Sequence, residues 1–106
     1  MVTIVITKKY RKKPVVVEAM TFDEMLKYAI VGPERVVVDR GVPWSFEISG
    51  HTVTVSNKSS DIYLISTLEG QMDMTRNDML IIGVAGEIYP CKKEIFDKTY
   101  EVVENE

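Results

Sequence analysis

Residues 62–89 read IYLISTLEGQMDMTRNDMLIIGVAGEIY, and their pattern is the strongest indication of the fold in this sequence. Short apolar runs alternate in it with turn-forming residues, which are Glu69-Gly70, Arg76-Asn77-Asp78 and Ala85-Gly86. Connections this short join antiparallel neighbours, because parallel strands need a crossover of about a dozen residues or more. The stretch therefore predicts a meander of antiparallel strands. Residues 62–65 are apolar on both faces and are expected to take a central place in it.

Upstream of this meander the pattern also predicts strands. Phe46 and Ile48 alternate with polar residues, and residues 52–55 (TVTV) alternate again after a predicted turn at Gly50-His51. The two runs predict a hairpin, and residues 52–55 could lie at a sheet edge and pair between two copies of the chain. Two further β-branched runs predict short strands, namely residues 15–17 after Pro14 and residues 35–38.

Residues 21–32 predict the only long helix. Thr21-Phe22-Asp23-Glu24 has the pattern of a capping box, in which the Thr21 hydroxyl and the Glu24 carboxylate each bind the other residue's amide. The apolar side chains that follow share one helical face and are Phe22, Met25, Leu26, Ala29 and Ile30. Gly32-Pro33 should end the helix.

The C-terminal part predicts a short helix over residues 93–98, with Ile95 and Phe96 pointing inward, and a closing strand at Tyr100, Val102 and Val103. The whole chain, residues 1–106, reads as one domain of ordinary globular composition, with 45% hydrophobic and 27% charged residues. The expected class is α+β: a strongly bent antiparallel sheet or small barrel with one main helix and a short C-terminal helix.

Charge is distributed unevenly along the chain. Residues 1–13 contain no acid and five bases, which are Lys8, Lys9, Arg11, Lys12 and Lys13. The remaining residues hold the other 8 of the 13 bases and all 16 acids, a balance of −8. Such a basic arm can contact nucleic acid or an acidic partner. Alternatively it flanks a strand and finds acidic neighbours on the domain's own surface.

The expected location is the cytoplasm. Cys91 is the only cysteine, so no disulfide can form within the chain. The longest apolar run, residues 79–82, is too short to span a membrane, and no secretory leader pattern is present.

The residues that could carry catalysis do not form a recognisable constellation. His51 is the only histidine, and Cys91, followed by Lys92-Lys93, could be a reactive thiol with His51 as its base. Asp78 and Glu87 could converge as an acid–base pair, although acids at turns more often form the turns themselves. Gly83 and Gly86 belong to no phosphate-binding motif and suit a tight hairpin. We expect no enzyme, no metal site and no cofactor.

Trp44 is the only tryptophan and follows Pro43 at the start of the predicted hairpin. Tryptophan is a frequent binding anchor, but it also lies at core edges where its indole N–H finds an acceptor. Both interpretations are open for Trp44.

Three stretches of the sequence resemble a family of small proteins encoded by tailed bacteriophages and prophages. The resemblance lies in residues 10–19 (YRKKPVVVEA), 64–72 (LISTLEGQM) and 77–92 (NDMLIIGVAGEIYPCK), together with Phe96 and Tyr100. The family typically opens with Lys-Lys-Pro…Glu-Ala and closes with Gly-Glu-x-Tyr-Pro-Cys. Asn77, Met79 and Lys93 stand where the family usually has glycine, an aromatic residue and proline. The resemblance implies phage origin and an accessory role, and no particular activity.

The resulting expectation is a non-enzymatic phage accessory protein that binds a host protein or a small signalling molecule, in host takeover or in evasion of host defence. The candidate binding residues are Trp44, Asp78, Glu87, Tyr89 and Cys91. The alternatives are a nucleic-acid-associated protein that uses the basic arm, which the acidic remainder disfavours, and a minor virion component. A homodimer is also expected.

Overall fold

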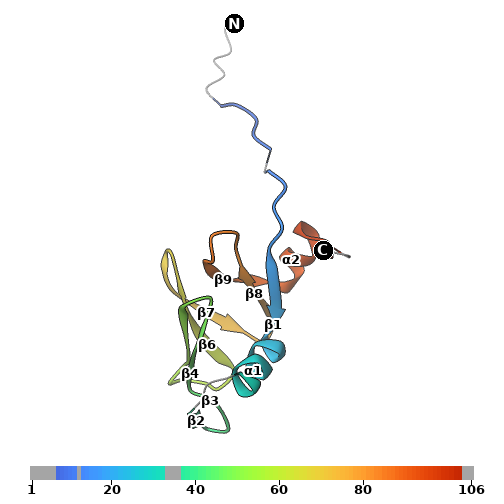
Figure 1. Ribbon diagram of the computed structural model, residues 1–106. Helices are drawn as coiled ribbons and strands as arrows, with labels where there is room; N and C mark the ends of the chain where they lie inside the picture. Colours follow the sequence, from blue (N-terminus) through green and yellow to red (C-terminus); the bar gives the residue numbers. More distant parts are fainter. Residues whose placement is uncertain (1–6, 12, 33–36, 104–106) are drawn as a thin grey trace, which may run out of the picture.

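The computed structural model describes residues 7–11, 13–32 and 37–103. Within these ranges two helices accompany antiparallel strands (Figure 1). The elements in chain order are β1 (Glu18–Thr21), α1 (Phe22–Val31), β2 (Val38–Asp39), β3 (Val42–Pro43), β4 (Ser45–Ile48), β5 (His51–Val55), β6 (Ile62–Thr67), β7 (Gly70–Thr75), β8 (Asp78–Ile82), β9 (Ile88–Lys92) and α2 (Lys93–Thr99). The predicted α+β class, with one main helix and a short C-terminal helix, is confirmed.

Helix α1 begins where the capping box predicts. Thr21 Oγ1 accepts from the Glu24 amide at 3.1 Å, and the Glu24 carboxylate accepts from the Thr21 amide at 2.9 Å. Its core face consists of Phe22, Met25 and Ala29. Ile30 was expected on this face but is 66% exposed, because it lies about 100° around the helix from Ala29. Pro33 lies outside the described residues.

The strands of the described residues form three antiparallel sheets, in the orders β4-β5-β6-β7, β1-β8-β9 and β2-β3. Strand β6 lies between β5 and β7, so the predicted central place of residues 62–65 is confirmed. Residues 52–55 were expected at an edge, and this is wrong, because β5 is paired on both sides. The β4–β5 hairpin itself is confirmed.

Two tight turns differ from the sequence prediction. The β4–β5 turn consists of Ser49 and Gly50, with φ of 53° and 79°, a pair of positive values that suits the twist of a two-residue hairpin. His51 is therefore not a turn residue but opens β5 opposite Ile48. Arg40 and Gly41 form a similar turn, with φ of 52° and 81°, and join β2 to β3, a hairpin that the sequence pattern did not reveal. Of the strand predicted at residues 35–38, residues 35 and 36 lie outside the described ranges.

The predicted strand at Val15–Val17 is wrong, since β1 begins only at Glu18. The reason lies in its partner: Glu18 pairs with Ile82, the last residue of β8, and the chain then turns away at Gly83. No residue of β8 remains opposite Val15–Val17. The predicted closing strand is also wrong, because residues 100–103 follow α2 without strand structure and Val102 is 87% exposed.

Helix α2 packs against β8 and β9 of the three-stranded β1-β8-β9 sheet (Figure 1). It contains no fully buried residue, and the inward position expected for Ile95 is wrong, since Ile95 is 52% exposed. Phe96 is half-buried, and its ring stacks on Tyr100 with 5.1 Å between ring centroids.

The core lies where α1 and both larger sheets meet. Its fully buried members include Phe22, Met25, Tyr63, Met74 and Leu80. The rings of Phe22 and Tyr63 meet edge to face at 5.6 Å, an arrangement that aromatic pairs favour. This core holds the β6–β7 and β8–β9 hairpins against each other, and the candidate site lies between their ends.

Candidate functional site

The β8–β9 hairpin carries four of the five predicted binding residues. Asp78 is the first residue of β8 and lies opposite Lys92, Cys91 lies opposite Met79, and Tyr89 lies opposite Ile81. Glu87 immediately precedes β9. Because side chains alternate along a strand, Tyr89 and Cys91 share one face of β9, whereas Ile88 points into the core.

Asp78 and Glu87 do not form an acid–base pair, because they stabilise different turns at opposite ends of this hairpin. Asp78 accepts hydrogen bonds from the Thr75 amide at 2.8 Å and from the Thr75 hydroxyl at 3.3 Å. The Glu87 carboxylate turns back onto the β8–β9 connection and accepts from the Ala85 amide at 3.1 Å. A Cβ at Gly83 would displace the Glu87 carboxylate from this position.

A groove of about 390 Å³ separates the end of the β6–β7 hairpin from β9. Thr67, Leu68, Glu69 and Met72 line it on one side and residues 87–90 on the other. Leu68 at the hairpin turn is 79% exposed, and Met72 is 42% exposed. The lining includes two acids, Glu69 and Glu87, and no base. The groove is therefore suited to an apolar group that carries or adjoins a positive charge.

The groove brings together Glu87 and Tyr89, two of the predicted residues. Burial, and after it a hydrogen bond with the Tyr100 side chain, raise the pKa of Tyr89 to about 12. Tyr89 is thus a neutral phenol at physiological pH that ties the groove wall to the segment after α2. Sequence reasoning missed Leu68 and Met72. Their only signal was an apolar residue, Leu68, directly before the Glu69-Gly70 turn.

Among the described residues no hydrogen bond joins Cys91 to His51. Cys91 is half-buried on β9, with its Sγ 3.6 Å from the carbonyl oxygen of Lys92. His51 opens β5, which belongs to the other large sheet. In the described ranges no group of three or more His, Cys, Asp or Glu side chains is arranged to hold a metal ion.

Trp44 lies apart from the groove, between β3 and β4. Its amide donates to the Val37 carbonyl at 2.7 Å, and its carbonyl accepts from the Val55 amide at 2.8 Å. The side chain is 48% exposed, whereas the neighbouring Pro43 is buried. Trp44 therefore lies at the border of the core with much of its indole in water, next to the exposed Val37 and Val38.

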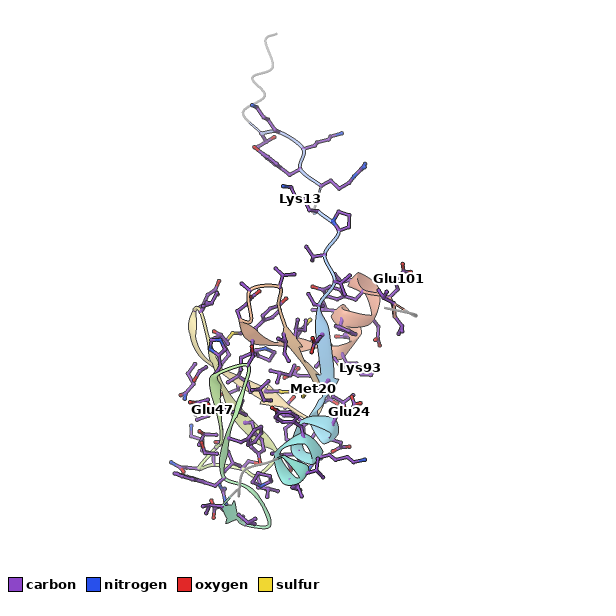
Figure 2. All side chains as sticks on the ribbon, in the orientation of Figure 1. Lys13, Met20, Glu24, Glu47, Lys93 and Glu101 are labelled. Carbon is purple, nitrogen blue, oxygen red and sulfur yellow. The ribbon has the colours of Figure 1, made fainter. Side chains whose placement is uncertain are left out.

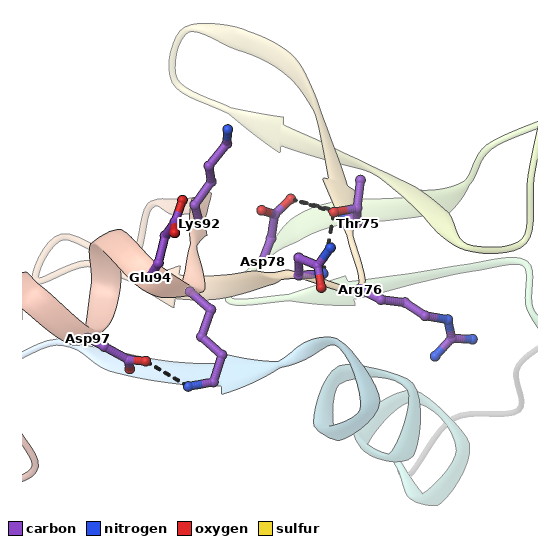
Figure 3. A pocket seen from close by; sticks show the side chains of 8 residues that line it. Thr75, Arg76, Asp78, Lys92, Glu94 and Asp97 are labelled. Atoms are coloured by element: carbon purple, nitrogen blue, oxygen red, sulfur yellow. Dashed lines mark hydrogen bonds and ion pairs between the residues drawn. The ribbon is translucent and has the colours of Figure 1, made fainter.

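A second, polar pocket of about 660 Å³ lies between the β7–β8 turn and the start of α2 (Figure 3). Its charged lining residues are three bases and three acids, namely Arg76, Lys92, Lys93, Asp78, Glu94 and Asp97. Lys93 is paired with Asp97 at 2.9 Å. Arg76 points away from the pocket in Figure 3 and pairs with Asp61 at 2.7 Å and Asp23 at 3.0 Å. With its charges balanced and partly paired, this pocket selects no class of ligand.

The described residues of the basic arm, 7–11 and 13, extend from the body rather than lying on it, and Lys13 stands clear of the sheets in Figure 2. Lys8, Lys9, Arg11 and Lys13 are all exposed, and Tyr10 is 90% exposed. Within the described part of the chain, none of these four bases forms an ion pair with the acidic body. Lys12 lies outside the described residues. No helix in the described ranges is long and apolar enough to cross a membrane.

Comparison with known proteins gives no match, since no family model, no curated protein and no solved structure matches this chain. The resemblance to phage proteins therefore stays a prediction, and the geometry of the groove is the main support for a functional proposal.

Proposed function

We propose that the chain is a non-enzymatic phage accessory protein that binds a host protein through the groove between the β6–β7 turn and β9. The observation that carries this proposal is the apolar groove with the exposed Leu68 and Met72 at its border and acids as its only charges. We call this surface the Leu68 groove.

The chemistry of the Leu68 groove favours a protein partner over a small signalling molecule. Most signalling nucleotides carry phosphates, and the carboxylates of Glu69 and Glu87 would repel them. Leu68 also projects from a turn, where only a large partner can remove it from water. The fitting ligand is a segment that combines an apolar side chain with a nearby lysine or arginine.

The size of this surface is consistent with a specific contact. Complete burial of one leucine or methionine side chain contributes about 1.5–3 kcal/mol. Because Leu68 is 79% and Met72 is 42% exposed, covering the rest of both side chains would contribute about 2–4 kcal/mol and strengthen binding by about 20- to 500-fold. A few anchors of this kind dominate most protein interfaces.

The test is an affinity capture from host lysate, with the intact complex identified by native mass spectrometry. Wild type, Leu68→Asp/Met72→Asp and Ile30→Asp are compared. Ile30 is a matched control, because it is also an exposed apolar residue but lies on α1. We expect the double variant to lose the captured protein and Ile30→Asp to retain it. Capture that survives the double variant would refute the role of the groove.

A second candidate function rests on the basic arm, whose described bases are exposed and form no ion pairs with the body. Such an arm could bind nucleic acid through phosphate contacts, although the −8 charge of residues 14–106 opposes this. Fluorescence anisotropy with labelled DNA and RNA at low and moderate salt tests it. An increase in anisotropy that disappears at moderate salt, and when the five bases are replaced by glutamine, would favour this function. Detection of the protein in purified particles would instead favour a virion component.

A further inference from the structure

Strand β1 lies at an edge of the β1-β8-β9 sheet. It pairs with β8 from Glu18 opposite Ile82 to Thr21 opposite Met79. In the described ranges no strand is hydrogen-bonded to its other edge. An edge of this kind presents unpaired amide and carbonyl groups, which can pair with a strand of another chain.

The segment before β1 extends this edge. Residues 13–17 run on from the strand, away from the body (Figure 1). Val15 is 43% and Val16 is 58% exposed, and both have the β-branched side chains that strands favour. A groove of about 430 Å³ lies alongside, between Val15–Val17 and the segment that follows α2, which contributes Val102 and Val103. The edge therefore continues into an apolar strip.

The charges around this strip are complementary to a second copy that runs antiparallel to the first. If two copies pair with the symmetry axis between Val15 and Val17, Lys13 of one copy lies beside residues 18–21 of the other. Lys8 of the first copy then reaches the level of residues 23–26. The acids there are Glu18, Asp23 and Glu24, which are all exposed in the single chain. The Asp23 side chain is 84% exposed even though it pairs with Arg76.

We propose that a second copy of this chain docks along the free edge of β1 and the Val15–Val17 strip. The two three-stranded sheets would join across a two-fold axis, so that the same surface is used by both copies. The described bases of each arm, Lys8, Lys9, Arg11 and Lys13, would then lie near the acids of β1 and the start of α1 in the partner. The partner's strand supplies the pairing for Val15–Val17 that β8 is too short to give.

The first experiment is sedimentation velocity over a range of protein concentrations, with wild type, Val16→Asp and Leu68→Asp. Wild type should be dimeric. Val16→Asp places two carboxylates near the symmetry axis and should weaken the dimer by about a hundredfold or more. Leu68→Asp should remain dimeric, because Leu68 lies on the other hairpin and outside this strip. A wild type that is monomeric at every concentration, or an unchanged Val16→Asp dimer, would overturn the proposal.

A cross-linking experiment locates the interface directly. In a Cys91→Ser background, Val16→Cys should form a disulfide-linked dimer under mild oxidation. Val84→Cys serves as the control, since Val84 is 73% exposed but lies in the β8–β9 connection. Equal cross-linking of both variants would show random collision and contradict docking at β1. Failure here leaves the capture experiment on the Leu68 groove unaffected, because the two surfaces share no residue.

Discussion

Tyr63 gives the sharpest test of the core, through the pH dependence of stability. Its side chain is completely buried, and its hydroxyl donates to the Pro43 carbonyl at 2.6 Å. Burial raises the pKa of Tyr63 to about 12, and the positive charges of Arg40 and Arg76 offset part of this effect. Tyr63→Phe keeps the ring and removes only the group that titrates.

At pH 7 the variant should be less stable than wild type. The Pro43 carbonyl loses its donor, and a buried polar group left without its partner costs about 1–3 kcal/mol. The ring contact with Phe22 is unchanged, so no cavity term adds to this loss.

At alkaline pH the difference between the two proteins should shrink. A phenol whose pKa is higher in the folded state stabilises the fold below its unfolded pKa of about 10, and this contribution is lost as the pH rises towards 12. Two pKa units correspond to about 2.7 kcal/mol, of which about 1.4 kcal/mol is gone at pH 11. The advantage of wild type over Tyr63→Phe should therefore shrink by about 1.4 kcal/mol between pH 9 and pH 11.

Urea unfolding followed by circular dichroism at pH 7, 9, 10 and 11 measures this difference. The other titrating groups are common to both proteins, so their effects cancel in the comparison. Tyr28→Phe is the control, because Tyr28 is 45% exposed and no hydroxyl bond to a buried group is removed. A difference between wild type and Tyr63→Phe that stays constant across this pH range would refute the burial argument.

Two further changes test the local devices of the fold. Thr21→Ala removes one half of the α1 capping box and should lower the free energy of unfolding by about 1 kcal/mol, measured by urea denaturation, with no effect expected if the helix start is set by packing alone. Gly86→Ala forces a Cβ into a φ of +83° and to 3.1 Å from Ser49 Oγ, which donates to the Gly86 carbonyl. Gly86→Ala should lower the free energy of unfolding, measured by urea denaturation, more than Gly50→Ala does. Gly50 has a similar φ of +79° but open space around it. The positive φ alone costs about 1–2 kcal/mol in either variant.

The sequence predicted the features whose causes are local. The capping box at Thr21 and Glu24 needs only residues three positions apart, and it forms as expected. Glycines before the apolar runs identified most hairpins, because positive φ is a property of single residues. The Arg40-Gly41 turn was missed, since only two residues on each side of it form strands and so short a run has no recognisable period.

The candidate site was predictable only in part, because it is made by two hairpins that are distant in sequence. Glu87 and Tyr89 were singled out from the β9 region, and both line the Leu68 groove. Asp78 was grouped with them but supports the turn at Thr75 instead. Leu68 could not be recognised, because a leucine in sequence gives no sign of whether the fold covers it.

The failed strand prediction at Val15–Val17 is informative for the same reason. Three successive β-branched residues favour an extended strand, yet a strand forms only where another backbone satisfies its amides and carbonyls. Within the described chain that partner ends at Ile82, which lies opposite Glu18, the first residue of β1. At Val15–Val17 the residues favour a strand, but the described chain offers no backbone for them to pair with. A disagreement of this kind is removed by an external strand, and the exposed valines, the free edge and the opposite charges all favour a second copy of the chain as its source.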